Sequence, residues 1–113
     1  MESIKSNNWL EGKGYKKRIL IENLKEKVNL IQDVIIPPHT IVSQHKHEYT
    51  DEIFYITENS AVMQVENKKF KVKAGDMILV NKQEIHGFEN NSSKELKLFV
   101  LKINFRKGDL YLK

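Results

Sequence analysis

Short apolar runs at regular spacing, separated by turn residues, are the feature that most constrains the fold of this 113-residue chain. The runs, rich in β-branched and aromatic residues or in apolar residues at alternate positions, are 17–22, 28–36, 53–57, 61–66, 69–73, 77–80 and 96–103. Such runs are typical of strands, whose alternate side chains face opposite sides of a sheet. In the run 69–73, Phe70 and Val72 face inward and the lysines face outward. Many short strands joined by turns predict an all-β sandwich or barrel.

Three segments carry more specific structural expectations. Asn67-Lys68 has the length and residue types of a hairpin turn between two of these strands. The run 96–105 changes its favoured apolar positions from even to odd numbers, which predicts a β-bulge or a strand covered on both faces. Residues 23–29 are the main helix candidate, although the segment is short and weakly amphipathic.

Length and composition limit the class of protein. The chain has the length of one domain, which we expect to span residues 1–113 with an N-terminal arm over residues 1–16. Cysteine is absent, which excludes disulfides and thiolate metal ligands. Any metal site must therefore use nitrogen and oxygen ligands.

The charge and hydropathy patterns argue against a nucleic-acid partner and a membrane partner. The formal net charge is +4, but acidic and basic residues are interleaved, and the densest basic stretch, 13–18, has only Tyr15 as an aromatic neighbour. We therefore expect no nucleic-acid partner. The first residues lack the pattern of a signal peptide, and no stretch is long enough to span a bilayer. We expect a cytoplasmic protein without a membrane partner.

Two histidines and a glutamate form the first part of a candidate metal site. His45 and His47 are two residues apart and face the same side of a strand, about 6.5–7 Å apart, so both imidazoles can reach one ion. Glu52 would point the other way on an unbroken strand. The polar residues 48–51 can turn, however. We therefore expect the strand that begins at Glu52 to pair with the histidine strand and return the carboxylate to the same side.

A third histidine completes the candidate site. His86 follows the turn-like segment 81–84 and can supply a ligand from a different strand. Three imidazoles and one carboxylate suit one divalent transition-metal ion, and Fe²⁺, Mn²⁺, Ni²⁺, Co²⁺ and Zn²⁺ all remain open. Asp51 is interpreted as a turn residue, and His39 is expected at a turn outside the site.

This constellation resembles the two sequence motifs of the cupin family. The first motif is Gly, five residues, His-x-His, three or four residues, Glu, six residues and Gly, and residues 39–59 fit its spacing. The second is Gly, five residues, Pro-x-Gly, two residues, His, three residues and Asn, and residues 75–90 fit it. All four metal-ligand positions of the family are matched, by His45, His47, Glu52 and His86.

Four backbone-shaping positions depart from the motifs. His39 and Asn59 stand where the first motif has glycines, and Asn81 and Gln83 stand where the second has its proline and a glycine. These family residues set the backbone shape and bind no metal. Asn and His accept positive φ better than most residues do, so we expect the turns to survive.

The resemblance implies a cupin-type double-stranded β-helix, or jelly-roll barrel, that holds one metal ion and binds a small molecule. It also implies a homodimer that pairs through sheet edges. Residues that share the inward parity and can line the pocket are Phe54, Ile56, Met63, Val65, Glu84 and Phe88. Among them, Glu84 is a candidate general base by parity alone.

Three kinds of function fit these residues. In a metal-dependent enzyme, four protein ligands leave one or two coordination positions open for water, O₂ or a chelating substrate. Proteins that look like this include dioxygenases, sugar isomerases, epimerases and decarboxylases. A non-catalytic module that binds a sugar or a carboxylate is the second, and a structural role with a vestigial site is the third. The sequence does not choose among them, because one fold supports many functions.

Overall fold

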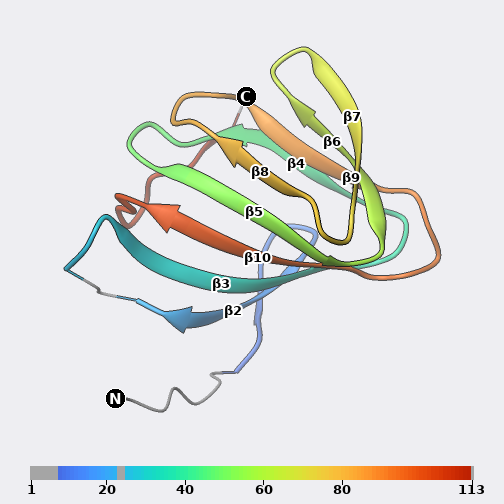
Figure 1. Ribbon diagram of the computed structural model, residues 1–113, viewed down its shortest axis with the longest axis horizontal. Helices are drawn as coiled ribbons and strands as arrows, with labels where there is room; N and C mark the ends of the chain where they lie inside the picture. The colour runs from blue at the N-terminus through green and yellow to red at the C-terminus, as the bar shows by residue number, and fades with distance from the viewer. Residues whose placement is uncertain (1–7, 23–24, 113) are drawn as a thin grey trace.

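The computed structural model describes residues 8–22 and 25–112, which form two antiparallel sheets with no helix among them (Figure 1). The six-stranded sheet contains, in spatial order, β1 (Leu10–Glu11), β2 (Lys16–Ile21), β3 (Val28–Ile36), β10 (Leu96–Ile103), β5 (Asp51–Glu58) and β8 (Met77–Val80). The five-stranded sheet contains β11 (Tyr111–Leu112), β4 (Thr40–Lys46), β9 (His86–Asn90), β6 (Ser60–Val65) and β7 (Lys68–Lys73). This confirms the predicted all-β class.

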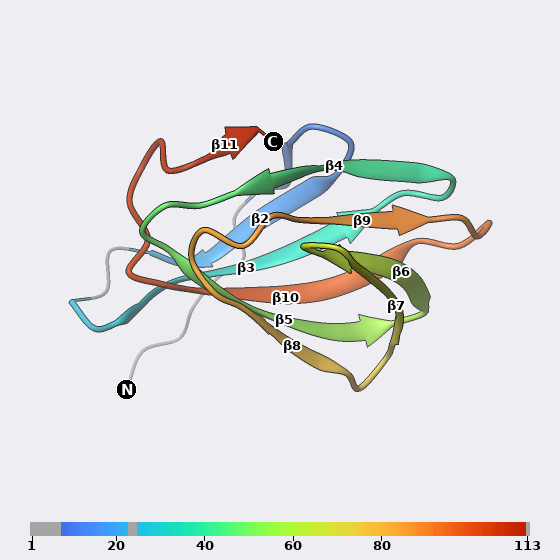
Figure 2. The ribbon, with the colours of Figure 1, turned by 90° about the horizontal axis from the view of Figure 1, so that it is seen from above.

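The apolar core lies between the two sheets, which face each other along their length (Figure 2). On β3, β5 and β10 the even-numbered residues point inward, as Ile36, Ile56 and Leu98 show with exposed fractions of 1%, 0% and 2%. Burying each such side chain contributes about 1.5–3 kcal/mol. The row of lysines on β7 is exposed and Val72 is buried, as the alternation predicts.

Two of the local predictions are wrong. The hairpin turn lies one residue earlier than expected, at Glu66-Asn67, and Glu66 takes the positive φ, 53°. The helix candidate 23–29 is not helical where it is described: residues 25–27 are bends, and β3 already begins at Val28 because the alternating pattern that follows extends back to it. Residues 23–24 lie outside the described residues.

Strand β10 keeps one inward parity throughout. Val100 is 3% exposed, while Phe99 is 36% exposed on the outer side of the sheet. Its pairing is irregular at two places, Lys97/Leu98 against β5 and Lys102/Ile103 against β3. The apolar odd-numbered residues therefore do not mark a change of face; they cover the outer side of a strand that lies in the middle of its sheet.

The N-terminal part of the described chain forms a sheet edge. Leu10 and Glu11 pair with Lys17 and Lys16 of β2, and residues 1–7 of the expected arm lie outside the described residues. Throughout the part of the chain that the structure describes, no helix is long and apolar enough to cross a membrane.

Three residues that replace motif glycines adopt the backbone conformation that glycine favours. The φ angles of His39, Asn59 and Gln83 are 52°, 69° and 70°. The left-handed region costs a non-glycine residue about 1–2 kcal/mol. The turns of the motifs therefore persist in this chain at the expense of local strain.

We predict that Gln83→Gly stabilises the protein by about 0.5–1 kcal/mol, because relief of the left-handed strain exceeds the extra chain entropy of glycine. Gln83 is exposed, and its backbone N–H, which donates to the carbonyl of His47 at 2.6 Å, remains in the variant. Urea unfolding measures the change. Lys82→Gly is the matched control, since Lys82 is not among the residues with positive φ and its replacement should destabilise. Equal losses of stability in both variants would contradict backbone strain at Gln83.

Candidate metal centre

Strand β4 turns His45 into the interior by means of a β-bulge. Val42 pairs with Phe88 of β9 and His45 pairs with His86, so β4 advances by one residue more than its partner between these pairs. The extra residue reverses the alternation, and Val42 and His45 both line the same cavity despite their opposite parity. His47 follows directly after the end of β4 and is 4% exposed.

Gly87 makes room for this bulge. A Cβ atom at Gly87 would lie 2.7 Å from the carbonyl oxygen of Val42 and 3.3 Å from the Cα of Gln44. Any side chain there would push β9 away from β4 and move His45 with it. Sequence analysis did not single out Gly87, although its place directly after a candidate ligand was a signal for close backbone approach.

Glu52 reaches the site from the other sheet, which corrects the expected pairing. Strand β5 pairs with β10 and β8 and not with the histidine strand. The polar segment 48–50 carries the chain across from one sheet to the other, so the carboxylate faces the histidines across the interior. Glu52 is 4% exposed and shares the inward side with Phe54 and Ile56, as their common parity predicts.

His86 lies beside His45 at the start of β9 and is 1% exposed. The ring centroids of these two residues are 4.4 Å apart, and those of His47 and His86 are 5.6 Å apart. One ligand atom from each of His45, His47, Glu52 and His86 lies within 4.8 Å of the other three. The structure thus brings together four side chains that are distant in the sequence.

Backbone carbonyls orient all three imidazoles. The Nδ1 atoms of His45, His47 and His86 lie 2.9, 2.5 and 3.0 Å from the carbonyl oxygens of Ser43, Asp109 and Glu84. A carbonyl only accepts, so each Nδ1 carries the proton and donates it. Each Nε2 then presents a lone pair to the centre of the group, as in metal-binding histidines.

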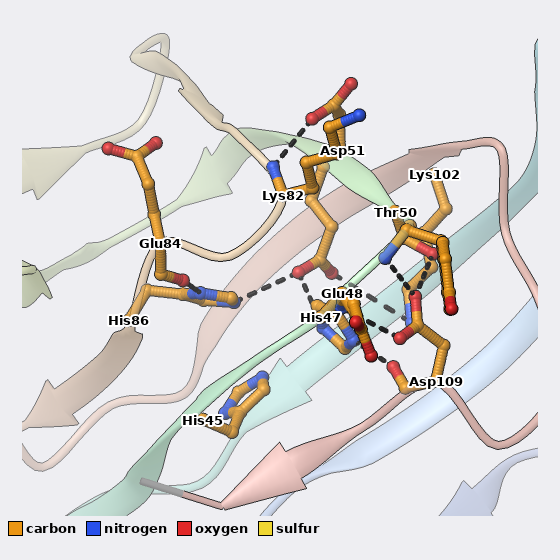
Figure 3. A network of polar contacts seen from close by, with 12 residues as sticks. His45, His47, Glu48, Thr50, Asp51, Lys82, Glu84, His86, Lys102 and Asp109 are labelled. Atoms are coloured by element: carbon orange, nitrogen blue, oxygen red, sulfur yellow. Dashed lines mark hydrogen bonds and ion pairs between the residues drawn. The ribbon is translucent and has the colours of Figure 1, made fainter.

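In neutral imidazoles hydrogen-bonded in this way, the inner atoms of the group are all acceptors, which supports a cation among them; Figure 3 shows His45, His47 and His86 around the centre of the group. Nε2 of His47 and Nε2 of His86 lie 2.8 and 3.0 Å from Oε1 of Glu52, and these three buried atoms have no hydrogen-bond partner. Two ligands at right angles around one ion, with bonds of about 2.0–2.1 Å, are separated by about 3 Å. The chemistry and spacing of the donor set therefore fit a divalent metal ion.

The pKa shifts of His47 and Glu52 show that the centre of the group attracts positive charge. Burial opposes the charged form of His47, but the neighbouring carboxylate of Glu52 outweighs it and raises the pKa of His47. Burial also opposes the charged form of Glu52, yet His47, His86 and Lys102 hold its pKa well below the usual range. Burial, with His86 next to it, lowers the pKa of His45 to about 4. Glu52 is thus an anion, and His45 is a neutral base at physiological pH.

A cavity of about 60 Å³ lies against the four candidate ligands. Its lining is largely apolar, with Val34, Val42 and Leu98 among the contributors. Three polar residues that sequence analysis missed also line it: Tyr15, Gln32 and Lys102. Their parity was a usable signal for two of them, since Gln32 lies between Leu30 and Val34 on β3, and Lys102 follows Val100 on β10.

The predicted pocket residues separate into three groups. Phe54 and Phe88 line the cavity. Ile56 and Met63 are fully buried in the core, and Val65 packs against it. The carboxylate of Glu84 accepts the backbone N–H of Asn81 and points away from the histidines (Figure 3), so Glu84 does not face the cavity.

Asp51 and His39 lie outside the group, as expected, but Asp51 is a strand residue and not the predicted turn residue. Asp51, the first residue of β5, accepts the backbone N–H of Lys82 through its carboxylate. His39 is exposed in the turn before β4.

Asp109 ties the C-terminal segment to the site. Its carboxylate accepts the backbone N–H groups of Glu48 and Tyr49 and the hydroxyl of Thr50, and its carbonyl accepts Nδ1 of His47. Burial opposes its charge, but the N–H groups of Glu48 and Tyr49 outweigh it and lower the pKa of Asp109. This one residue therefore orders the chain between two candidate ligands and orients one of them.

We predict that Asp109→Asn destabilises the protein by about 1–3 kcal/mol at pH 7. The NH₂ group of the asparagine would face N–H and O–H donors whose hydrogen bonds the wild-type carboxylate accepts. The pKa of Asp109 is lower in the folded state than in the unfolded state. Its contribution to stability is therefore complete above the unfolded pKa, about 3.9, and is lost as pH falls through the folded value. The difference in urea stability between variant and wild type should therefore shrink in acid.

The same variant should bind Co²⁺ about tenfold more weakly, since it loosens the segment whose carbonyl accepts the Nδ1 proton of His47. Asp76→Asn is the control, because the Asp76 carboxylate also accepts a backbone N–H, that of Lys73, in the turn between β7 and β8. Wild-type Co²⁺ affinity in folded Asp109→Asn would contradict the orienting role of this segment.

Two antiparallel sheets around one cavity, with three imidazoles and a carboxylate at its wall, define a double-stranded β-helix protein with a candidate metal site. The sequence profile of the Cupin domain family matches residues 32–102. Because this match covers more than half of the chain, the protein belongs to the cupin family.

Two curated proteins are similar in sequence. The oxalate-binding protein of Thermotoga maritima is 32% identical over 80 residues, which cover 71% of this chain and 66% of that protein. An uncharacterised protein of Methanocaldococcus jannaschii is 35% identical over 68 residues, which cover 60% of this chain and 54% of that protein. The similarity therefore spans less than two thirds of either relative.

Solved structures are similar over most of the chain. A protein described as a predicted oxalate decarboxylase from Thermotoga maritima has a TM-score of 0.72 and 27% identity, covering 90% of this chain and 94% of that one. KdgF from a Halomonas species has a TM-score of 0.78, 18% identity and 89% coverage of both chains. The second similarity concerns the fold alone.

Proposed function

We propose that this protein binds one divalent transition-metal ion on His45, His47, Glu52 and His86, and through it a small carboxylate ligand. The observation that carries the proposal is the set of inward-facing acceptor atoms without hydrogen-bond partners. A bound ion would supply Lewis acidity toward an oxygen atom of the ligand.

The cavity supports a ligand of small size. Four protein ligands leave one or two coordination positions open in a five- or six-coordinate ion. The cavity of about 60 Å³ adjoins these ligands. A single water needs about 10–15 Å³ measured this way, so the space holds roughly five waters or a small organic acid. The name of the Thermotoga relative, an oxalate-binding protein, supports a carboxylate of this size.

Binding without turnover is the simpler function for this cavity. Among the described residues that line it, Glu52 is the single carboxylate, and its charge faces the histidines. A metal-dependent enzyme, such as a dioxygenase, isomerase, epimerase or decarboxylase, is the second candidate. It is favoured by Tyr15 and Lys102, two residues with proton-bearing side chains that line the same cavity. Carbon-13 NMR of labelled oxalate with the metal-loaded protein separates the two, since binding alone leaves the acid intact.

We predict that Glu52→Gln lowers the affinity for Co²⁺ or Zn²⁺ at least tenfold, because it removes the single anionic ligand while keeping the side-chain size. Calorimetric titration and elemental analysis under a competing chelator measure the change. Glu58→Gln on the same strand is the control, since Glu58 is exposed and pairs with Lys97 at 3.1 Å. Unchanged metal occupancy in Glu52→Gln would refute the proposed site.

We also propose that the protein is a homodimer, through the outer face of the six-stranded sheet. An outer apolar patch, defined as Tyr55, Met77, Leu79 and Phe99, has exposed fractions of 36%, 65%, 55% and 36%. Tyr55 pairs with both Met77 and Phe99, so the patch is continuous across three strands. Clusters of this kind mark interaction surfaces.

A second copy of the chain is the occupant that this patch fits. The charged residues beside it are already paired within the chain, Arg18 with Asp33 at 2.5 Å and Lys97 with Glu58 at 3.1 Å. The patch therefore offers an apolar centre with balanced charges, which is self-complementary in a two-fold dimer. This location differs from the expected pairing through sheet edges.

We predict that Met77→Glu converts the dimer to a monomer, because it places a charge in the apolar contact. Light scattering after size-exclusion chromatography measures the mass. Ile41→Glu on the five-stranded sheet, at a residue that is 65% exposed, should remain dimeric. A monomeric wild-type protein at working concentration would refute the interface.

A further inference from the structure

Two polar side chains from neighbouring strands form part of the cavity wall. Neither of them is a candidate metal ligand. Gln32 lies on β3 and Lys102 on β10, and both line the cavity. In the register of these strands Gln32 is opposite Val100 and Lys102 is opposite Leu30, so the two are diagonal neighbours on the inner face. Diagonal pairs of this kind are about 7–8 Å apart at the backbone, within reach of one small ligand.

Gln32 is a little-exposed residue of the cavity wall whose side-chain amide has no hydrogen-bond partner among the described residues. Gln32 is 5% exposed, and within the described ranges 8–22 and 25–112 its side chain makes no hydrogen bond. Polar groups of little-exposed residues almost always have a hydrogen-bond partner in the protein, in water or in a ligand. Since this amide lines the cavity, the missing partner belongs to whatever occupies the cavity.

Lys102 is a second donor with unused capacity. Its side chain is 14% exposed, and its Nζ lies 3.9 Å from Oε2 of Glu52, beyond hydrogen-bond distance. It also lies 5.3 Å from the ring centroid of Phe105. It is the one lysine or arginine side chain among the described residues that line the cavity. An ammonium group has three donors and no acceptor, so its partner must be an acceptor.

The balance of charge favours a dianion over a neutral ligand. With a divalent ion in place, Glu52 is the one carboxylate against the ion and the ammonium of Lys102, which leaves excess positive charge in a buried site. Buried charges require compensation. A sugar offers none, whereas a dicarboxylate offers one negative group to the ion and another to Lys102.

We propose that Lys102 and Gln32 form an anion subsite that holds the distal carboxylate of a small dicarboxylate, whose proximal carboxylate binds the metal ion. This inference rests on the proposed metal function. Lys102 supplies the charge and Gln32 the directional N–H donor, and the small cavity limits the acid to a short one. These two residues determine specificity and leave metal binding to the histidines and Glu52.

The experiment compares Co²⁺-loaded wild type with Lys102→Met and Gln32→Met, which keep side-chain length and remove the donors. Calorimetry measures the affinities for Co²⁺, oxalate, malonate and acetate, and thermal unfolding checks the fold. Lys97→Met is the control, on the same strand but paired with Glu58 at the surface. We expect Lys102→Met to bind the better of the two dicarboxylates at least tenfold more weakly, with a smaller change for acetate.

The affinity for Co²⁺ is not expected to fall together with the affinity for the dicarboxylate. Removal of a cation next to Glu52 should leave Co²⁺ affinity unchanged or raise it, so weaker dicarboxylate binding with equal or tighter metal binding supports the subsite. A Co²⁺-loaded wild type that binds neither dicarboxylate overturns the inference, and so do folded variants that bind them as wild type does. Failure of wild type to bind Co²⁺ refutes the proposed function itself and is seen separately in the metal titration.

Discussion

The convergence of hydrogen-bond acceptors between the two facing sheets of the barrel is the constraint on which the rest of this structure depends. Each imidazole donates its Nδ1 proton to a backbone carbonyl, which leaves its Nε2 lone pair pointing at the other ligands. Acceptors that meet at about 3 Å repel one another unless a cation lies between them. The barrel supplies the packing that holds them there, and the proposed cation would supply the attraction.

The barrel meets this constraint with a few local devices. A bulge in β4, admitted by Gly87, turns His45 inward, and the crossing segment after His47 places Glu52 on the opposite sheet. Asp109 then fastens that segment from the C-terminal side. Each device concerns backbone shape, which explains why positions without ligand chemistry matter to the site.

Much of the fold and of the candidate site could be predicted from the sequence. Alternation identified the strands and the inward faces, and the spacing of two motifs singled out the four residues that the structure brings together. The partner strand of Glu52 could not be predicted, because strand pairing over long separations leaves no local trace. Gln32 and Lys102 escaped notice because isolated polar residues in strands are usually exposed, and Asp109 because its contacts are almost wholly with backbone groups.

Element-resolved anomalous scattering from crystals of the protein tests the central claim most directly. The account predicts one transition-metal peak within about 2.0–2.3 Å of the three Nε2 atoms and a carboxylate oxygen of Glu52. A site that remains free of metal in crystals grown with excess Co²⁺ or Zn²⁺, with protons or water joining the same atoms, would contradict it.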